Sequence, residues 1–306
     1  IAGAARVLIS EVVRGHGGVL RDRHGARFME RVPGAELAPR DVVSRAIFER
    51  MVATQDTSVY LDLSSVKDPH VLFPGISQIC RYFGIDIARD PVPVRPGAHY
   101  QIGGLETDLE GRTSVAGLWA VGECASSGLH GANRLGSNSL LEGLVLGERA
   151  GQRAAEEAQG KGIQDWRVRA PRETAAAPVG MRVNIQDVTY SLKSLMWRQM
   201  GIERSGAEIE DALAKIRLWS RAVSELGTPE PATWELVNLL TVAHLASLSA
   251  LARTESRGVH YRTDHPALDP AWQAHTRCTP VFEEGHIDGV VVEPVPLLRS
   301  EPLVRT

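Results

Sequence analysis

The chain has 306 residues, of which 43% are hydrophobic and 23% charged, and its formal net charge is −3. This length allows two or three domains with buried cores, and the small net charge gives no electrostatic case for binding nucleic acid or an anionic membrane. Its three cysteines, Cys80, Cys124 and Cys278, form neither a CxxC pair nor a disulfide framework, so a reducing cytoplasm is the expected location. We find no apolar run near the roughly 18–20 residues that span a bilayer, and no signal peptide.

The first part of the chain, residues 1–98, mixes short strands, turns and helices. The segment RDRHGA stands between apolar runs, which is typical of a hairpin turn. Pro39 suits the first turn of a helix, and apolar residues then recur at helical spacing: Val42, Val43, Ala46, Ile47 and Met51. VYLDLS is predicted to be a short strand, and FPGISQICRYFGI a second helix that Gly84 closes.

Residues 99–160 predict a strand followed by a helix. GLWAVGE has the pattern of a short buried strand, and LLEGLVLGERAGQRAAEEA that of a helix. Ser139 and Glu142 have the S-x-x-E spacing of a capping box at the helix start. A strand, a glycine-rich turn and a helix in this order are typical of a nucleotide-binding α/β layer.

The remainder of the chain is predicted to be mostly helical. Residues 161–182 are a linker rich in Pro, Gly and Ala. Three helices follow, in VTYSLKSLMWRQM, after the S-x-x-E motif Ser205–Glu208, and in TWELVNLLTVAHLASLSALA, and they predict a three-helix bundle. The last 45 residues are expected to be rich in loops.

Three features of residues 118–151 could carry chemistry. Glu123 follows a predicted strand, where it would either bind sugar-like hydroxyls or serve as a loop acid. The helix that begins near Ser139 offers unpaired N–H groups to an anion or to an electron-rich ring, although a plain capped helix is the better explanation of the pattern by itself. Arg134 lies among small residues, where its guanidinium could bind a ligand carboxylate or pair with an internal acid.

His99 and Arg40 are candidates from the first part of the chain. His99 precedes two glycines and could donate to a carboxylate, or be a structural histidine. Arg40 lies in the first turn of a predicted helix, where the helix dipole disfavours a cation. This placement would lower the pKa of Arg40 and would suit a proton donor or acceptor, with simple solvation at the surface as the alternative.

Several common motifs are missing from the sequence. The 10 histidines form no HExxH motif and no Cys/His cluster, so no metal site is predicted. There is no Walker-type GxxxxGK[ST], no GxGxxG and no GxSxG.

The glycine-rich stretch carries a family resemblance. GLWAVGECASSGLHGANRLGSNSLLEGLVLG resembles the second flavin-binding segment of the fumarate reductase/succinate dehydrogenase flavoprotein family. Further similarity lies in SEVVRGHGGVLRDRHGARFM, ELAPRDVVSRAI, PVPVRPGAHYQIGGLETDLEGRT, SLMWRQMGIERS and ESRGVHYRTDHP. SNSLLE, GAHYQIGG and the short C-terminal bundle point to the branch of the family that oxidises L-aspartate.

The resemblance implies roles in substrate binding. Arg40, in ELAPRD, matches the proton-transferring arginine of the family. His99, in GAHY, and Arg134, in HGANR, match the pair that holds a substrate carboxylate. Ser10 and Glu11 match a Thr-Glu pair that meets the other end of the dicarboxylate, with serine keeping the hydroxyl group.

The resemblance also implies a cofactor and a fold. FAD would be the cofactor, with Glu123 as the flavin-contacting acid and the backbone of Ser139 and Leu140 meeting the isoalloxazine ring. The fold class is a multidomain α+β or α/β protein. Its parts would be a capping domain (1–98), the C-terminal part of a Rossmann-like FAD-binding domain (99–160), a linker (161–182) and a helical C-terminal domain (183–306).

The implied reaction is FAD-dependent oxidation of L-aspartate to iminoaspartate, with oxygen or fumarate as the acceptor, as the first step of NAD biosynthesis by the quinolinate route. L-aspartate and fumarate would be ligands, and quinolinate synthase a candidate partner. The sequence lacks the family's GxGxxG segment, so we expect these residues either to be part of a larger enzyme or to lack activity. The alternatives are a soluble fumarate reductase or succinate dehydrogenase flavoprotein subunit, and an inactive fragment that serves as an interaction module.

Overall fold

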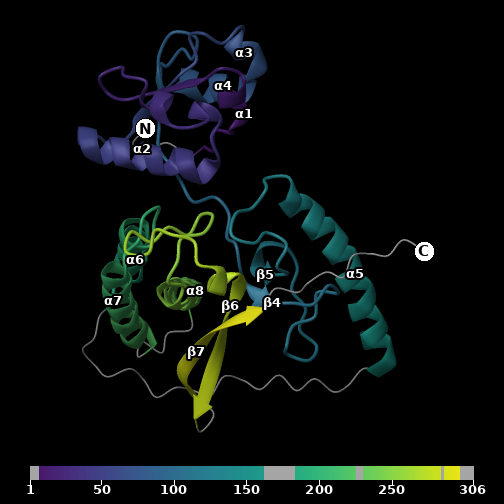
Figure 1. Cartoon of the computed structure of the whole chain (residues 1–306). Coiled ribbons are helices and arrows are strands. Elements are labelled where there is room, and N and C mark those ends of the chain that lie inside the picture. The colour runs from purple at the N-terminus through teal and green to yellow at the C-terminus, as the bar shows by residue number, and fades with distance from the viewer. Residues whose placement is uncertain (1–6, 162–182, 225–229, 284–285, 297–306) are drawn as a thin grey trace. The chain divides into compact units, whose positions relative to one another are not determined.

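The computed structural model describes residues 7–161, 183–224, 230–283 and 286–296 (Figure 1). The chain forms two compact units, residues 1–100 and residues 101–306. This division confirms a multidomain mixture of helices and strands, and each unit has its own core.

The first unit surrounds a small antiparallel sheet of three strands in the order β1-β2-β3, namely β1 (Val19–Arg21), β2 (Val59–Asp62) and β3 (Val92–Val94). Leu20 pairs with Leu61, and Tyr60 pairs with Pro93. The helices are α1 (Val12–Gly15), α2 (Arg40–Thr54), α3 (Pro69–Leu72) and α4 (Pro74–Tyr82), with 3-10 turns at Phe28–Arg31 and Ala35–Leu37.

The predicted local features of this unit are largely present. In α2, Val43 and Ile47 are buried, and Val42, Ala46 and Met51 pack against the same core. The RDRHGA segment turns tightly, because the Asp22 N–H donates to the Ala26 carbonyl. Gly84 has φ +73°, which agrees with its predicted place after α4.

The second unit contains a two-stranded parallel sheet, a long helix, a helical bundle and a hairpin. Strands β4 (Leu105–Glu106) and β5 (Ala125–Ser126) pair in parallel, and α5 (Asn138–Lys161) follows them. The bundle consists of α6 (Ile185–Gln199), α7 (Gly206–Ser224) and α8 (Pro231–Ala252). The three bundle helices pack on one another around a shared apolar core (Figure 1).

Two predictions for this unit were wrong. GLWAVGE forms a 3-10 turn at Gly122–Cys124 instead of a strand, and only an isolated bridge joins Trp119 to Arg112. The C-terminal region is not mainly loop, because β6 (Ala274–Glu283) and β7 (His286–Pro296) form a long antiparallel hairpin that packs on α8. Thr and Pro residues and Gly289 interrupt the alternation of apolar and polar residues by which strands are predicted from sequence.

The membrane argument from the sequence also needs correction. Helix α8 has 22 residues and includes an 18-residue window with a mean hydropathy of 1.4, which is enough by length and composition to cross a membrane. Counting uninterrupted apolar runs missed it, because Glu235, Asn238 and His244, with several Thr and Ser residues, interrupt the run, while the many Leu, Val and Ala residues keep the average high. In the structure, one side of α8, including Leu236, Leu240 and Ala243, packs into the bundle core.

Candidate functional site

The first unit contains four of the predicted site residues, three of them at the starts of two helices. Ser10 and Glu11 directly precede α1, and the Ser10 hydroxyl accepts a hydrogen bond from the Val12 N–H at 3.4 Å. Arg40 lies in the first turn of α2, as predicted, and is its first residue, because Pro39 is the N-cap residue and does not belong to the first turn as we had expected. His99 lies in the extended segment that follows β3.

Arg40 links the other two ionisable members of this group. Its Nε donates to the Glu11 carboxylate, and its Nη1 lies 3.2 Å from Nε2 of His99. Nδ1 of His99 lies 3.3 Å from the Gly97 carbonyl oxygen. A neutral imidazole with its proton on Nδ1 satisfies both contacts, because Nδ1 then donates to Gly97 and Nε2 accepts from Arg40.

The electrostatics of this Arg40 cluster overturn one prediction. The hydrogen bond to Glu11 raises the pKa of Arg40, instead of the helix dipole lowering it. The same hydrogen bond lowers the pKa of Glu11. A charge-assisted hydrogen bond at contact distance outweighs the partial charge of one helix end. The cluster is therefore a fixed ion pair, with the imidazole as a second acceptor for the guanidinium.

Sequence reasoning missed one further arginine at this cluster. Arg14 lies in α1, three residues after Glu11, and it interacts electrostatically with both Glu11 and Arg40. Burial lowers the pKa of Arg14, and its Nη1 donates to the Glu36 carbonyl. The i, i+3 spacing of Glu11 and Arg14 was the signal that could have revealed it.

The second unit holds Glu123 close to the β4–β5 pair. Gly122, with φ +77°, allows the 3-10 turn that carries Glu123, and Glu123 Oε1 accepts the Gln101 N–H at 2.7 Å. A Cβ atom on Gly104 would lie 2.3 Å from the Cys124 carbonyl oxygen, so only glycine permits this close approach of the two chain segments. Glu123 is thus oriented by the backbone around it.

Arg134 lies in the loop 127–137, which connects β5 to α5. Two side chains of the loop, Ser127 and His130, bind the buried carboxylate of Glu142 in α5, with Nε2 of His130 at 2.8 Å from the carboxylate. The Arg134 Nη1 donates to the Gly136 carbonyl at 2.8 Å. Glu142 therefore ties the loop to the helix on one side of Arg134.

The capping-box prediction at Ser139 and Glu142 was wrong for a related reason. Helix α5 already begins at Asn138, so Ser139 lies inside its first turn, and Glu142 binds Ser127 and His130 instead. The other S-x-x-E motif does form, because the Glu208 N–H donates to the Ser205 hydroxyl and the two side chains also bond. The S-x-x-E pattern therefore forms a helix cap at Ser205 but not at Ser139.

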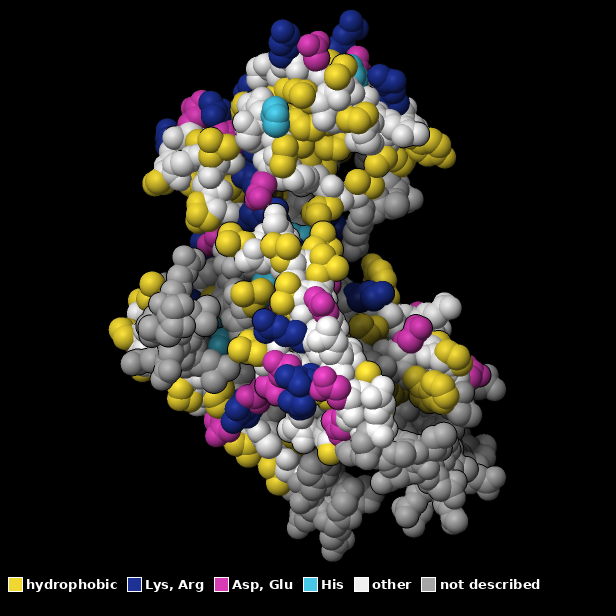
Figure 2. All heavy atoms as spheres, turned by 90° about the vertical axis from the view of Figure 1, so that its right-hand side faces the viewer, with side chains coloured by type: hydrophobic (Ala, Val, Ile, Leu, Met, Phe, Trp, Pro, Cys, Tyr) yellow, Lys and Arg dark blue, Asp and Glu magenta, His cyan; other side chains and the backbone are white. Residues whose placement is uncertain are grey.

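The start of α5 has features that fit a bound flavin. The Ser139 hydroxyl oxygen is buried and has no hydrogen-bond partner within the described residues. Apolar side chains on the same part of the helix are exposed, namely Leu140, Leu141, Leu144 and Val145. In Figure 2, which looks onto the side that carries α5, hydrophobic side chains gather along one part of the helix and charged ones further along it. The unpartnered Ser139 hydroxyl would suit the polar edge of an isoalloxazine ring, and the exposed apolar side chains beside it would suit the face of the ring.

Comparisons with known proteins place these residues in a family. The model of the FAD binding domain matches residues 1–140, and that of the fumarate reductase flavoprotein C-terminal region matches residues 189–305. The chain is 42% identical over 273 residues to the L-aspartate oxidase of Mesorhizobium japonicum, which covers 89% of this chain and 48% of the relative. The chain belongs to the fumarate reductase and succinate dehydrogenase flavoprotein family.

Other members of this flavoprotein family agree with that assignment. The L-aspartate oxidase of Bacillus subtilis is 41% identical, with 89% of this chain and 49% of the relative covered. A solved E. coli quinol fumarate reductase chain has a TM-score of 0.77 and 29% identity, with 97% of this chain and 57% of that chain covered. The chain spans about half the length of the curated relatives it matches. The family match indicates FAD as the cofactor.

Proposed function

We propose that the protein to which this chain belongs uses FAD to oxidise L-aspartate to iminoaspartate. The observation that carries this proposal is the Arg40 cluster, in which Glu11 and His99 both bind one guanidinium at the start of a helix. It supports the proposal because it occurs in a chain whose relatives, at 41% and 42% identity, are named L-aspartate oxidase.

The proposed substrate is a small dicarboxylate, so its binding needs cations and hydrogen-bond donors. Arg134 would bind a carboxylate through its planar fork of N–H donors, together with His99, whose Nδ1–H would exchange the Gly97 carbonyl for the substrate. Ser10 and Glu11 would orient the other end of the substrate, the Ser10 hydroxyl as a donor to its carboxylate and the Glu11 carboxylate as an acceptor for its ammonium group. Holding both ends would restrict a flexible diacid to one reactive geometry, which can lower the barrier by several kcal/mol.

Proton transfer is assigned to Arg40. This role follows from the family resemblance at ELAPRD. The ion pair with Glu11 fixes the direction of the guanidinium and raises the pKa of Arg40, so Arg40 would act as a charged proton donor, as the reduction of fumarate requires. When bound, FAD would supply the acceptor for the hydride that leaves the substrate α-carbon. Glu123 and the first turn of α5, with Ser139 and Leu140, would hold the cofactor through hydrogen bonds and apolar contact.

The wider reaction belongs to the same proposal. Oxygen or fumarate would serve as the final electron acceptor, and iminoaspartate would enter quinolinate synthesis on the route to NAD, with quinolinate synthase as a partner. We expect the enzyme in the cytoplasm.

The experiment is a flavin bleaching assay on the full-length, FAD-loaded protein. L-aspartate should bleach the oxidised flavin under anaerobic conditions, and an Arg134→Leu variant should keep its flavin content but lose dicarboxylate binding. Unchanged substrate affinity in this variant would overturn the assignment of Arg134.

A second candidate, fumarate reduction, is favoured by the similarity to the quinol fumarate reductase structure. The same assay separates the two candidates, because bleaching by succinate but not by L-aspartate would support the second. The reverse pattern would support the first.

A further inference from the structure

A tight hairpin turn at residues 257–260 of the second unit contacts the loop that carries Arg134. The Arg257 N–H donates to the His260 carbonyl at 2.8 Å, and the His260 N–H donates to the Arg257 carbonyl at 3.0 Å. Gly258 has φ +57° and occupies the first central position, which is typical of the II′ turns that close two-residue hairpins. Gly258 and Val259 therefore form the tip of the turn.

The tip rests directly on the backbone of Ala132, two residues before Arg134. The Val259 N–H donates to the Ala132 carbonyl oxygen at 3.0 Å. A Cβ atom on Gly258 would lie 2.3 Å from this oxygen and 2.7 Å from its carbonyl carbon. Real Cβ atoms do not approach backbone so closely, so any side chain at Gly258 would push the Arg134 loop away.

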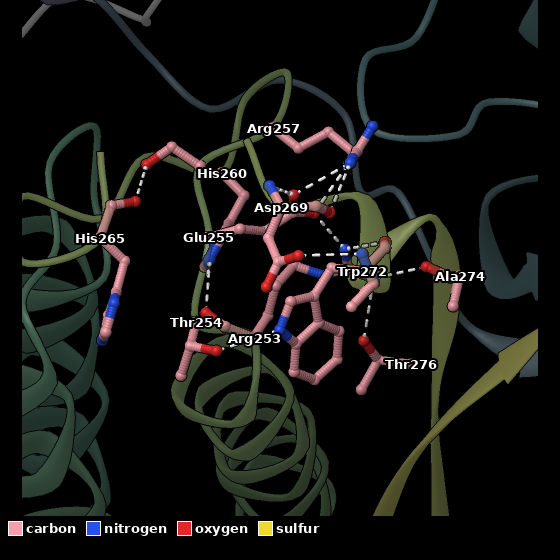
Figure 3. A network of polar contacts seen from close by, with 12 residues as sticks. Arg253, Thr254, Glu255, Arg257, His260, His265, Asp269, Trp272, Ala274 and Thr276 are labelled. Carbon is pink, nitrogen blue, oxygen red and sulfur yellow. Dashed lines mark hydrogen bonds and ion pairs between the residues drawn. The ribbon is translucent and has the colours of Figure 1, made fainter. Parts of the chain in front are cut away.

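A buried ion network holds the base of the turn (Figure 3). The Glu255 side chain is fully buried and accepts from Arg253 Nη1 at 2.6 Å and from Arg257 Nε at 2.7 Å. It also accepts a hydrogen bond from the Asp269 N–H at 2.9 Å. The guanidinium carbon of Arg253 lies 5.0 Å from the centre of the Trp272 ring. Because the Glu255 carboxylate has several partners, it fixes the orientation of the turn at residues 257–260.

The turn is also joined to the end of a bundle helix. Arg262, whose side chain is 3% exposed, pairs with Asp264 and donates to the Ala250 and Leu251 carbonyls at 3.0 and 3.1 Å. These carbonyls belong to the last turn of α8, where they have no partner within the helix. The bundle thus provides the support on which the turn is built.

We propose that Gly258 and Val259 position Arg134 for carboxylate binding, so that the helical C-terminal region fixes the geometry of the substrate site. Glu142 holds the loop through Ser127 and His130, and the turn holds it at Ala132. A loop held at both points presents its arginine in one orientation, and this lowers the cost of ordering it on binding. The inference deepens the proposed function and rests on it.

The test uses the full-length, FAD-loaded protein and measures succinate binding through the change in the flavin absorbance spectrum. In a Gly258→Ala variant, succinate affinity should fall about tenfold or more, since displacements near 1 Å can cost up to ~100-fold. KM for L-aspartate should rise by a similar factor while the flavin content stays the same. Gly117→Ala is the matched control, because Gly117 also has positive φ, at +81°, but a Cβ there would meet no atom within 4 Å.

A double-mutant cycle with Arg134→Leu separates positioning from a general loss of structure. If Gly258 acts through Arg134, then Gly258→Ala should not weaken succinate binding further in the Arg134→Leu background. Full additivity of the two effects would overturn the positioning role. If Arg134→Leu alone leaves succinate affinity unchanged, the assignment of Arg134 itself is wrong, and with it this inference.

Arg257→Lys provides the test if Gly258→Ala fails to fold. It keeps the positive charge but loses the two-pronged contact with Glu255, whose Oε2 accepts from Arg257 Nη2 at 3.0 Å. We expect succinate affinity to fall about threefold in this variant, again without further effect in the Arg134→Leu background. If Arg257→Lys binds succinate as tightly as the control variant Gly117→Ala does, the inference is wrong.

Discussion

Arg40 donates from its Nε to the Glu11 carboxylate, 29 residues away in the sequence, and this ion pair raises the pKa of Arg40. The contact joins the starts of two helices, α1 and α2, in the first unit. It makes Glu11 the residue that fixes the direction and charge of the guanidinium.

Glu11→Gln should therefore reduce turnover of L-aspartate by the full-length enzyme. Removing the carboxylate leaves Arg40 without its charged partner, and a displaced proton-transfer group typically costs about 100-fold in kcat. Steady-state kinetics measure the effect. Glu30→Gln is the control, since Glu30 is an exposed carboxylate of the same unit that lies 3.7 Å from Arg27. Equal kcat in the two variants would argue against a role of Glu11 at Arg40.

Ser139→Ala should weaken FAD binding without destabilising the FAD-free protein. The Ser139 hydroxyl is buried without a partner in the described part of the chain, so its removal costs no internal hydrogen bond. If it bonds the flavin, its loss should weaken FAD affinity about 2- to 12-fold, the range for one neutral hydrogen bond. Titration of the FAD-free protein with FAD gives the affinity, and thermal unfolding gives the stability. Unchanged affinity would remove Ser139 from the cofactor site.

Glu142→Ala should destabilise the second unit. The Glu142 carboxylate is buried and accepts from Ser127 and His130, so its removal leaves two donors without their acceptor. The expected loss is about 2–3 kcal/mol of unfolding free energy, which urea denaturation would measure. Glu148→Ala, at an exposed position on the same helix, should change stability by less than about 0.5 kcal/mol. A similar small effect at both sites would contradict the role of Glu142.

Glu255→Ala should lower the free energy of unfolding by more than Glu142→Ala does. It leaves Arg253 and Arg257 beside a fully buried position with no carboxylate, and breaking a buried ion pair in this way costs about 3–5 kcal/mol. Urea denaturation monitored by tryptophan fluorescence would report the loss, because Arg253 lies over the Trp272 ring. Glu235→Ala, at an exposed site on α8, should behave like the wild type.

Acid should destabilise the turn at residues 257–260 through His260. Burial, together with the nearby Arg204, lowers the pKa of His260 from 6.5 to about 4. The unfolded chain therefore binds a proton below pH 6.5 that the folded chain does not bind until about pH 4. The stability from the neutral imidazole is complete above pH 6.5 and is lost as the pH falls towards 4.

Thermal midpoints measured from pH 7 to pH 4 would test this prediction. They should fall more steeply in the wild type than in His260→Gln, which cannot take up the proton. Arg253 and Arg262 also face the imidazole and disfavour its charged form. Parallel curves for the two proteins would show that His260 does not titrate in this window.

Features set by neighbouring residues could be predicted from the sequence. Pro39 and the apolar spacing of Val43 and Ile47 predict the helix α2 and its start to within one residue, because helix starts and buried stripes depend on residues a few positions apart. The capping motif at Ser205 formed as predicted, with the Glu208 N–H donating to the Ser205 hydroxyl three residues before it. The family resemblance likewise follows from contiguous motifs, above all HGANRLGSNSLLE.

The tertiary structure decided what depends on distant partners. Glu11 reversed the predicted direction of the Arg40 pKa shift, and Ser127 and His130 drew Glu142 away from the predicted capping box. The contact between Gly258 and Ala132 joins residues that no local pattern connects. Local propensity involves fractions of a kcal/mol. A charge-assisted hydrogen bond at contact distance, a buried carboxylate that needs partners, and a backbone approach that leaves no room for a Cβ atom each outweigh it, so the long-range contacts determined these outcomes.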